Sequence, residues 1–321
     1  MSSYLDTVQH PWTLEDIHVA IFKNFTDALE SIEETAGGKL WKSPNDLQDS
    51  LWIFQKSTIE LLDEICVFGD RSRDNFFWHD NARAEAHSRE VKRYVFNCTS
   101  SLMALVDHAR VFERKYPVIG YKEHLVKFFP EQGLHNFLQC FRNYNTHWRV
   151  AEANWLIKQN LQTRSREACF TIGKHELLVW NGWDQRAKRF ISEANEYIDI
   201  YKVFSLYRGH VQKFYAWHKG AVLVQYASTY KSYLEYKRLY DGLQKKIYWN
   251  MILSKVPKTL NPYEYFGRYL SKKQLEVLLT LEQGSALQVD TLIHMLGMND
   301  FCDANLRGKG MSVFKSHENK S

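Results

Sequence analysis

Apolar residues recur at intervals of three and four positions over most of this chain, which is the spacing of one face of an α-helix. The clearest case lies between residues 88 and 116, and its apolar positions are Val91, Val95, Cys98, Leu102, Leu105, Ala109 and Phe112. A shorter segment, residues 51–65, repeats the pattern and carries acidic residues elsewhere on the helix. Both segments therefore predict amphipathic helices with one buried face.

Proline and glycine divide this pattern into separate helices. Pro117 and Gly120 end the long helix, and Pro130 and Gly133 break the segment that follows. Helical spacing then restarts and continues through residues 141–147, with these apolar residues facing inward: Leu134, Phe137, Leu138 and Phe141. We therefore predict a helix that begins after Gly133 and reaches the middle of the chain.

The second half of the chain contains the main departures from helical spacing. Residues 166–180 combine β-branched and aromatic residues around Gly173, which indicates a short strand or hairpin arm. Residues 181–256 return to helical spacing, with one predicted apolar stripe made of Phe190, Ala194, Ile198, Tyr201 and Phe204. Two prolines and a glycine in residues 256–269 predict a linker, a helical pair follows to residue 298, and a polar, mobile tail starts near Arg307.

These elements predict an all-α fold: a helical bundle extended by further C-terminal helices, with one short hairpin. Only 15 glycines and 6 prolines occur in 321 residues, and such scarcity of turn formers favours long helices over a many-stranded sheet. We predict three parts: a bundle over residues 1–165, additional helices packed on it over 166–256, and the linker, helical pair and tail over 257–321.

Composition and charge narrow the function classes. A formal net charge of +5 is compatible with a nucleic-acid partner without requiring one. Five widely spaced cysteines without CxxC or Cys/His ligand spacing indicate neither a disulfide framework nor a zinc site, so we expect no metal and no cofactor. The N-terminus lacks the features of a signal peptide, and no apolar run is long enough to span a bilayer. We therefore expect a cytoplasmic protein without a membrane partner.

The candidate chemistry lies in FRNYNTH, residues 141–147. Arg142 offers a planar set of donors suited to a phosphate, and a histidine such as His147 can transfer protons near neutral pH. RNA supplies its own nucleophile, the 2′-hydroxyl, so these two groups suffice in principle for cleavage without a metal. Asn143 and His147 lie four residues apart, where the amide can orient the ring. Arg142 and His147 lie five apart, about 140° round an ideal helix, so either the arginine bends towards the histidine or a second chain supplies the partner.

The motif and the helix before it, with LVDHARVF at residues 105–112, resemble the HEPN superfamily (higher eukaryotes and prokaryotes nucleotide-binding domains). Members are helical bundles whose signature is an arginine, usually a polar residue, and a histidine four to six residues later. Arg142, Asn143 and His147 match this signature. The resemblance covers roughly residues 45–160, and more loosely the helices to about residue 255.

The resemblance implies a metal-independent endoribonuclease that acts as a homodimer, with Arg142 and His147 as the catalytic pair and Asn143 in support. It also implies that the two motif helices meet in one composite cleft. Many relatives are toxins or antiviral defence effectors that cut cellular RNA, and toxins of this kind are commonly paired with an antitoxin or other regulatory partner. Other relatives have lost activity, so the alternative is a non-catalytic helical protein that binds nucleotides or RNA, or serves as a scaffold.

Four further residues are candidates for RNA contacts, each with a structural alternative. Arg149 can contact a phosphate or be solvated, and Tyr144 can stack on a base or fill the core. His108 and Arg110 can line the cleft or connect helices. The tyrosines and cations interleaved over residues 230–246 can follow an RNA backbone or form an ordinary charged helix face.

Overall fold

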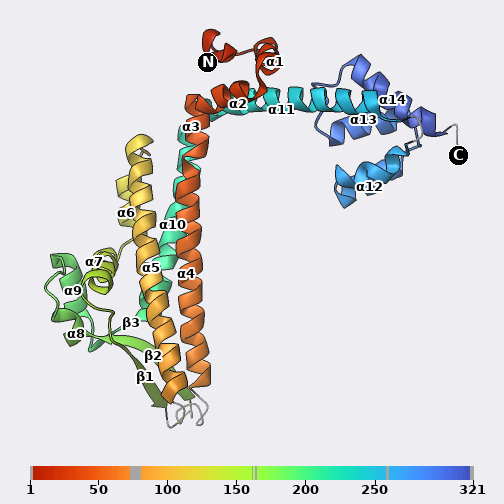
Figure 1. Ribbon diagram of the computed structural model, residues 1–321. Coiled ribbons are helices and arrows are strands. Elements are labelled where there is room, and N and C mark those ends of the chain that lie inside the picture. Colours follow the sequence, from red (N-terminus) through yellow and green to blue (C-terminus); the bar gives the residue numbers. More distant parts are fainter. Residues whose placement is uncertain (1–2, 73–80, 161, 163–164, 258–259, 319–321) are drawn as a thin grey trace. The chain divides into compact units, whose positions relative to one another are not determined.

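The computed structural model describes residues 3–72, 81–160, 162, 165–257 and 260–318. These residues form fourteen α-helices and one three-stranded sheet, which confirms the predicted, mostly helical fold class (Figure 1). None of the described helices combines the length and the apolar character needed to cross a membrane. The chain forms two compact units: a central unit, Leu40–Ala227, and a terminal unit that joins Met1–Lys39 to Ser228–Ser321.

This division differs from the three predicted parts, because the two longest helices of the second half belong to different units. Helix α10 (Ile200–Gln225) packs against α4 (Pro44–Arg71) and α6 (Tyr121–Phe128) in the central unit. The apolar residues of α11 (Ala227–Lys255) instead join a core formed with the N-terminal helices. The boundary therefore falls between these two helices, and not near residues 165 or 256.

The central unit is built around the antiparallel pair of α4 and α5 (Asn81–Lys115), which lie side by side over most of their length (Figure 1). All seven predicted apolar positions of α5 are buried: Val91, Val95, Cys98, Leu102, Leu105, Ala109 and Phe112. Spacing alone thus identified the buried face of the longest helix correctly.

Helix α7 (Leu134–His147) begins where the sequence predicts, directly after Gly133. Gly133 precedes it with φ of +84°, a left-handed conformation that favours glycine. A Cβ atom added to Gly133 would lie 2.5 Å from the carbonyl oxygen of Arg186, so this turn needs glycine for its space as well. The four predicted inward residues are buried, and α7 packs against α5 and α9 (Gln185–Glu193).

A small antiparallel sheet, in the order β1-β2-β3, follows α7. The predicted arm around Gly173 is confirmed in part as strand β2 (Ser165–Gly173), which pairs with a strand that the sequence did not indicate, β1 (Ala153–Asn160). The part of the prediction beyond Gly173 is wrong, because the short helix α8 (Lys174–Leu178) starts directly after it.

Strand β3 (Tyr197–Asp199) shows that the predicted helical stripe from Phe190 to Phe204 is wrong. Ile198 pairs with Ile172 of β2, and the Asp199 side chain accepts a hydrogen bond from the backbone N–H of Lys202 at the start of α10. The chain is therefore extended between α9 and α10, because strand pairing and a helix cap replace the single helix.

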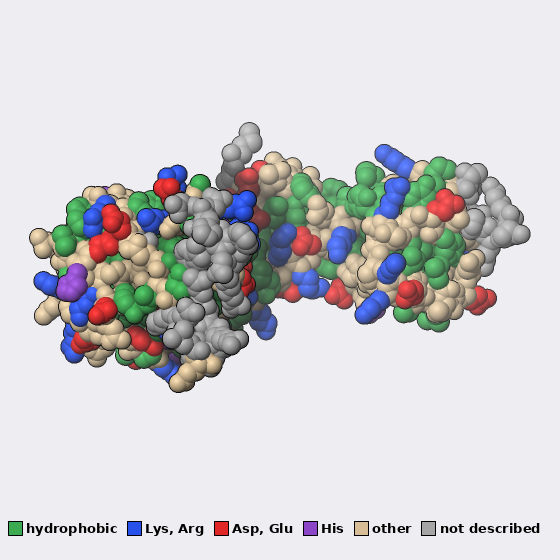
Figure 2. Space-filling model, turned by 90° about the horizontal axis from the view of Figure 1, so that it is seen from below, with side chains coloured by type: hydrophobic (Ala, Val, Ile, Leu, Met, Phe, Trp, Pro, Cys, Tyr) green, Lys and Arg blue, Asp and Glu red, His purple; other side chains and the backbone are tan. Residues whose placement is uncertain are grey.

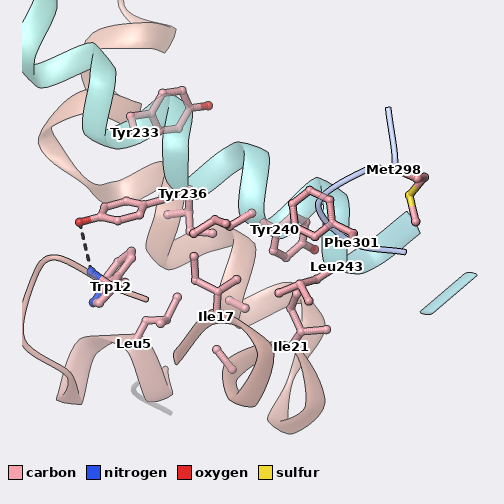
Figure 3. Packing of buried hydrophobic residues seen from close by; sticks show 14 of the residues in the cluster. Leu5, Trp12, Ile17, Ile21, Tyr233, Tyr236, Tyr240, Leu243, Met298 and Phe301 are labelled. Atoms are coloured by element: carbon pink, nitrogen blue, oxygen red, sulfur yellow. Dashed lines mark hydrogen bonds between the residues drawn. The ribbon is translucent and has the colours of Figure 1, made fainter. Parts of the chain in front are cut away.

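The terminal unit contains η1 (Tyr4–Thr7), α1 (Leu14–Lys23), α2 (Phe25–Glu34) and α11, and α3 (Ala36–Lys42) crosses its boundary. Figure 3 shows tyrosines of α11 pointing into the core of this unit. Tyr233, Tyr236 and Tyr240 are buried, and the Tyr236 hydroxyl accepts a hydrogen bond of 3.3 Å from the backbone N–H of Trp12. These tyrosines hold the unit together and are not available to an RNA strand.

The C-terminal segment also differs from the prediction. The expected linker contains η3 (Pro262–Arg268), whose Phe266 is buried, and the helical pair is confirmed as α12 (Lys272–Leu279) and α13 (Ala286–Met295). The expected mobile tail is helix α14 (Ala304–Glu318), with Leu306 and Phe314 in apolar cores. These two buried residues stabilise a segment whose polar composition suggested a tail.

Candidate functional site

The motif occupies the C-terminal end of α7, and a buried amide fixes where the helix stops. The Asn145 side chain donates a hydrogen bond of 2.9 Å to the carbonyl oxygen of Phe141. Its oxygen accepts a hydrogen bond of 3.0 Å from the backbone N–H of Ala151. The chain beyond the helix is thus tied back to the last turn, and the motif rests on an ordered helix end.

Glu176 of α8 joins the residues around this helix end. Its Oε1 atom accepts hydrogen bonds from the Tyr144 hydroxyl at 3.3 Å and from the backbone N–H of Glu152 at 2.9 Å. Arg149 donates from Nε to the Tyr144 hydroxyl at 3.2 Å and places Nη2 3.4 Å from Glu176. We call Tyr144, Arg149, Glu152 and Glu176 the Glu176 network.

This network decides between the alternatives for two predicted RNA contacts. Tyr144 is fully buried, and burial raises the pKa of its phenol, so its ring is a core residue and not an exposed base-stacking platform. Arg149 forms an ion pair with Glu176 and a hydrogen bond with Tyr144, and its guanidinium also lies over the Trp148 ring. Both side chains therefore stabilise the helix end, and the phosphate contact of the exposed Arg149 stays a prediction.

Arg142 and Asn143 pair with each other. The Arg142 Nη1 atom donates a hydrogen bond of 3.1 Å to the Asn143 side-chain oxygen. The Arg142 Nε atom is buried and has no hydrogen-bond partner within the described residues. The amide of Asn143 therefore positions the arginine, and it does not orient the His147 ring as the four-residue spacing suggested.

His147 is the last residue of α7, and it is exposed. In the described part of the chain, no hydrogen bond or ion pair joins its ring to Arg142, to Asn143 or to any other side chain. An ideal helix places residues five apart about 140° from each other, and the side chains of Arg142 and His147 remain separate here.

His108 and Arg110 of α5 lie away from the motif. The His108 Nδ1 atom lies 2.5 Å from the Ser50 hydroxyl of α4, so this histidine connects the two long helices. Arg110 pairs with Asp107 at 3.2 Å and lines a cavity beside the first turn of α7. No described contact brings either residue to the motif, and the structural alternative holds for His108.

Sequence reasoning missed this cavity, which has a volume of about 810 Å³. Its walls come from α5, α6, the connection 129–133, the first turn of α7, α9 and α10, all in the central unit. On α7 the lining residues are His135 and Asn136, two polar residues just ahead of the motif. The sequence signal for the cavity is this pair of adjacent polar residues in the first turn of an otherwise apolar helix.

Surface charge does not mark a nucleic-acid site on the face drawn in Figure 2. There the described Lys and Arg side chains lie among Asp and Glu side chains and form no continuous basic track. Exposed apolar side chains do occur next to the motif, at Trp148 and Val150.

No protein-family model matches the chain, and comparison with curated proteins and with solved structures gives no significant match. The resemblance to the HEPN superfamily therefore rests on the motif residues and on the pattern of the helices around them.

Proposed function

We propose that the protein is a metal-independent endoribonuclease of the HEPN type, in which Arg142 binds the scissile phosphate and His147 transfers the proton. One observation carries the proposal. Most polar side chains around the end of α7 make hydrogen bonds to each other or to the backbone, namely those of Tyr144, Asn145, Arg149 and Glu176. Within the described residues, His147 and most of the Arg142 guanidinium make none.

The state of Arg142 supports a role in anion binding. A guanidinium carries five N–H donors, and the Asn143 amide takes a hydrogen bond from only one of its nitrogen atoms. A buried donor without a partner is costly, so an incoming phosphate would relieve that cost. Asn143 holds the guanidinium beside the helix and reduces the entropy lost when an anion binds.

The exposure of His147 supports a role in proton transfer. A general acid or base must reach its substrate, and the ring at the end of α7 is open to solvent and makes no hydrogen bond within the described residues. The separation of Arg142 and His147 within one chain supports a cleft formed by two chains. Exposed Trp148 and Val150 beside the motif suit such a homodimer contact.

The test is cleavage of total RNA in EDTA by the wild type, Arg142→Ala and His147→Ala. Matched controls are Arg89→Ala and His175→Ala, which remove an exposed arginine and an exposed histidine elsewhere in the central unit. We expect the two motif variants to lose about 100-fold or more in cleavage rate, and the controls to retain it. Because the 2′-hydroxyl attacks, the products should carry a cyclic phosphate or its hydrolysed form.

Equal cleavage by all five proteins, or none by the wild type, would contradict the proposal. Overexpression gives a second readout: growth arrest that either motif substitution relieves is expected of a toxin or antiviral effector. An antitoxin encoded nearby would then suppress the arrest caused by the wild type.

A non-catalytic RNA-binding or scaffold protein is the second candidate, and one observation favours it. Within the described residues, Arg142 and His147 make no contact, so one chain alone does not assemble the pair. This candidate predicts RNA binding that Arg142→Ala weakens, with no cleavage by the wild type at any protein concentration.

A further inference from the structure

The cavity at the start of α7 has the character of a ligand site. Apolar side chains such as Leu105, Ala109 and Phe129 form most of its wall, and a few polar groups converge on it. A volume of about 810 Å³ lies within the range of small-molecule sites. It lies in the central unit, and the motif residues do not line it.

Three tyrosines line this cavity: Tyr121 of α6, and Tyr207 and Tyr215 of α10. The Tyr207 hydroxyl lies 2.7 Å from His135 Nδ1. The hydroxyls of Tyr121 and Tyr215 have no hydrogen-bond partner in the part of the chain that is described. Burial is the main cause of the raised pKa of both phenols. It raises the pKa of Tyr121 to about 12, and it also raises that of Tyr215. Both therefore remain neutral donors that lack an acceptor.

The charged residues of the cavity are three arginines and one carboxylate. Arg110 and Arg189 pair with exposed acids on their own helices, and the guanidinium of Arg186 makes no hydrogen bond to a described side chain. Glu131 is the single carboxylate, and its Oε2 atom lies 2.6 Å from Nε2 of His210. Burial lowers the pKa of His135, the positive charge of Arg110 lowers it further, and the negative charge of Asp184 acts in the opposite direction. The lining residues thus carry more positive than negative formal charge, which suits an anionic ligand.

We propose that this cavity binds an organic anion, a small molecule with an apolar body and a carboxylate or phosphate group. The apolar body occupies the space between Leu105, Ala109 and Phe129. The oxyanion accepts hydrogen bonds from Tyr121 and Tyr215 and lies near Arg110 and Arg186. This site is independent of the proposed ribonuclease activity, since its residues and its test do not involve the motif.

The test uses the fluorescent dye 1-anilinonaphthalene-8-sulfonate, an aromatic anion, and the uncharged dye Nile red as a reference. Each is titrated into the full-length wild type, Arg110→Ala, Arg186→Ala, Tyr215→Phe and two variants that fill the cavity, Ala109→Phe and Val106→Phe. Arg89→Ala is the matched control, because it removes an exposed, ion-paired arginine from the same helix as Arg110. Circular dichroism shows which variants are folded.

We expect one saturable site for the anionic dye, with a dissociation constant about fivefold higher in Arg110→Ala and in Arg186→Ala, where solvent screening moderates the effect. The same variants and Arg89→Ala should bind Nile red as the wild type does. A folded filling variant should lose this site for both dyes.

Wild-type affinity of the anionic dye in both arginine variants would overturn the proposal, as would wild-type binding in a folded filling variant. If neither filling variant folds, the arginine variants decide. A smaller apolar cavity of about 310 Å³ in the terminal unit does not confuse the result, because none of the substituted residues lines it.

Discussion

The two ends of α7 use polar side chains in opposite ways. At the C-terminal end, Tyr144, Arg149 and Glu176 bind one another and leave His147 exposed at the surface. At the N-terminal end, His135 and its neighbours surround a cavity in which several donors have no acceptor. One end thus leaves a histidine exposed at the surface, and the other encloses a cavity.

This difference teaches that polar residues on one helix can become candidates for function for different reasons. The motif residues Arg142 and His147 are candidates because they take little part in the hydrogen bonds that join their neighbours. The cavity residues are candidates because several helices bring them together. The first kind is visible in a sequence pattern, and the second appears only in the folded chain.

The largest effect should come from the core that both ends share. Phe141 is fully buried between Phe137 and Tyr144, so Phe141→Ala should lower the free energy of unfolding by about 3–5 kcal/mol. Chemical denaturation measures the change, with Thr146→Ala, an exposed site on the same helix, as the control. A loss below 1 kcal/mol, on the order of a surface substitution, would mean that α7 is not anchored as described.

The cavity end should be sensitive to acid through His218 of α10. Its ring is buried against Tyr121 and Phe214, and burial lowers the pKa of this histidine from 6.5 to about 4. The folded protein therefore holds it neutral, while the unfolded chain takes up a proton below pH 6.5. Stability is complete above that pH and falls as the pH drops towards 4.

When the pH falls from 7 to 4.5, protonation of His218 in the unfolded chain should lower the free energy of unfolding by about 2–3 kcal/mol. Denaturation of the wild type and His218→Gln at both pH values isolates the contribution, because the variant should lose less stability on acidification. His147→Gln serves as the reference at the other end, and it should follow the wild type. Identical pH profiles for wild type and His218→Gln would refute the assignment.

Only part of this picture was predictable from the sequence. The spacing on α5 and the break at Gly133 depend on local geometry, so they fixed helix faces and boundaries correctly. Strand β3 and helix α14 were missed because pairing with β2 and burial of Phe314 override their local patterns. The motif was found because its residues are close in sequence. The cavity was not, since its residues come from five helices and meet only through packing.

A smaller effect is expected for the coupling energy between Arg149 and Glu176 in the Glu176 network. A double-mutant cycle with Arg149→Ala and Glu176→Gln should give a coupling energy of about 0.5–1 kcal/mol, because the Arg149 side chain is partly exposed and screened. Thermal or chemical denaturation of the four proteins supplies the cycle. A coupling of zero would show that the two side chains support the helix end independently.

The smallest effect on stability should come from the motif itself. His147→Ala should change the free energy of unfolding by less than about 0.5 kcal/mol, because the ring is exposed and makes no hydrogen bond within the described residues. Any loss of RNA cleavage in this variant would then reflect function. A destabilisation similar to that of Phe141→Ala would instead make His147 part of the fold.

The most direct test of the central claim mixes two inactive variants. Arg142→Ala and His147→Ala are combined, unfolded and refolded together, and assayed for RNA cleavage in EDTA beside each variant alone. In a mixed dimer, one chain keeps Arg142 and the other keeps His147, so one of the two Arg–His pairs across the interface is intact. We expect roughly a quarter of the wild-type rate, because about half of randomly formed dimers are mixed. Cleavage no greater than that of the separate variants, with the wild type active after the same treatment, would contradict a cleft built by two chains.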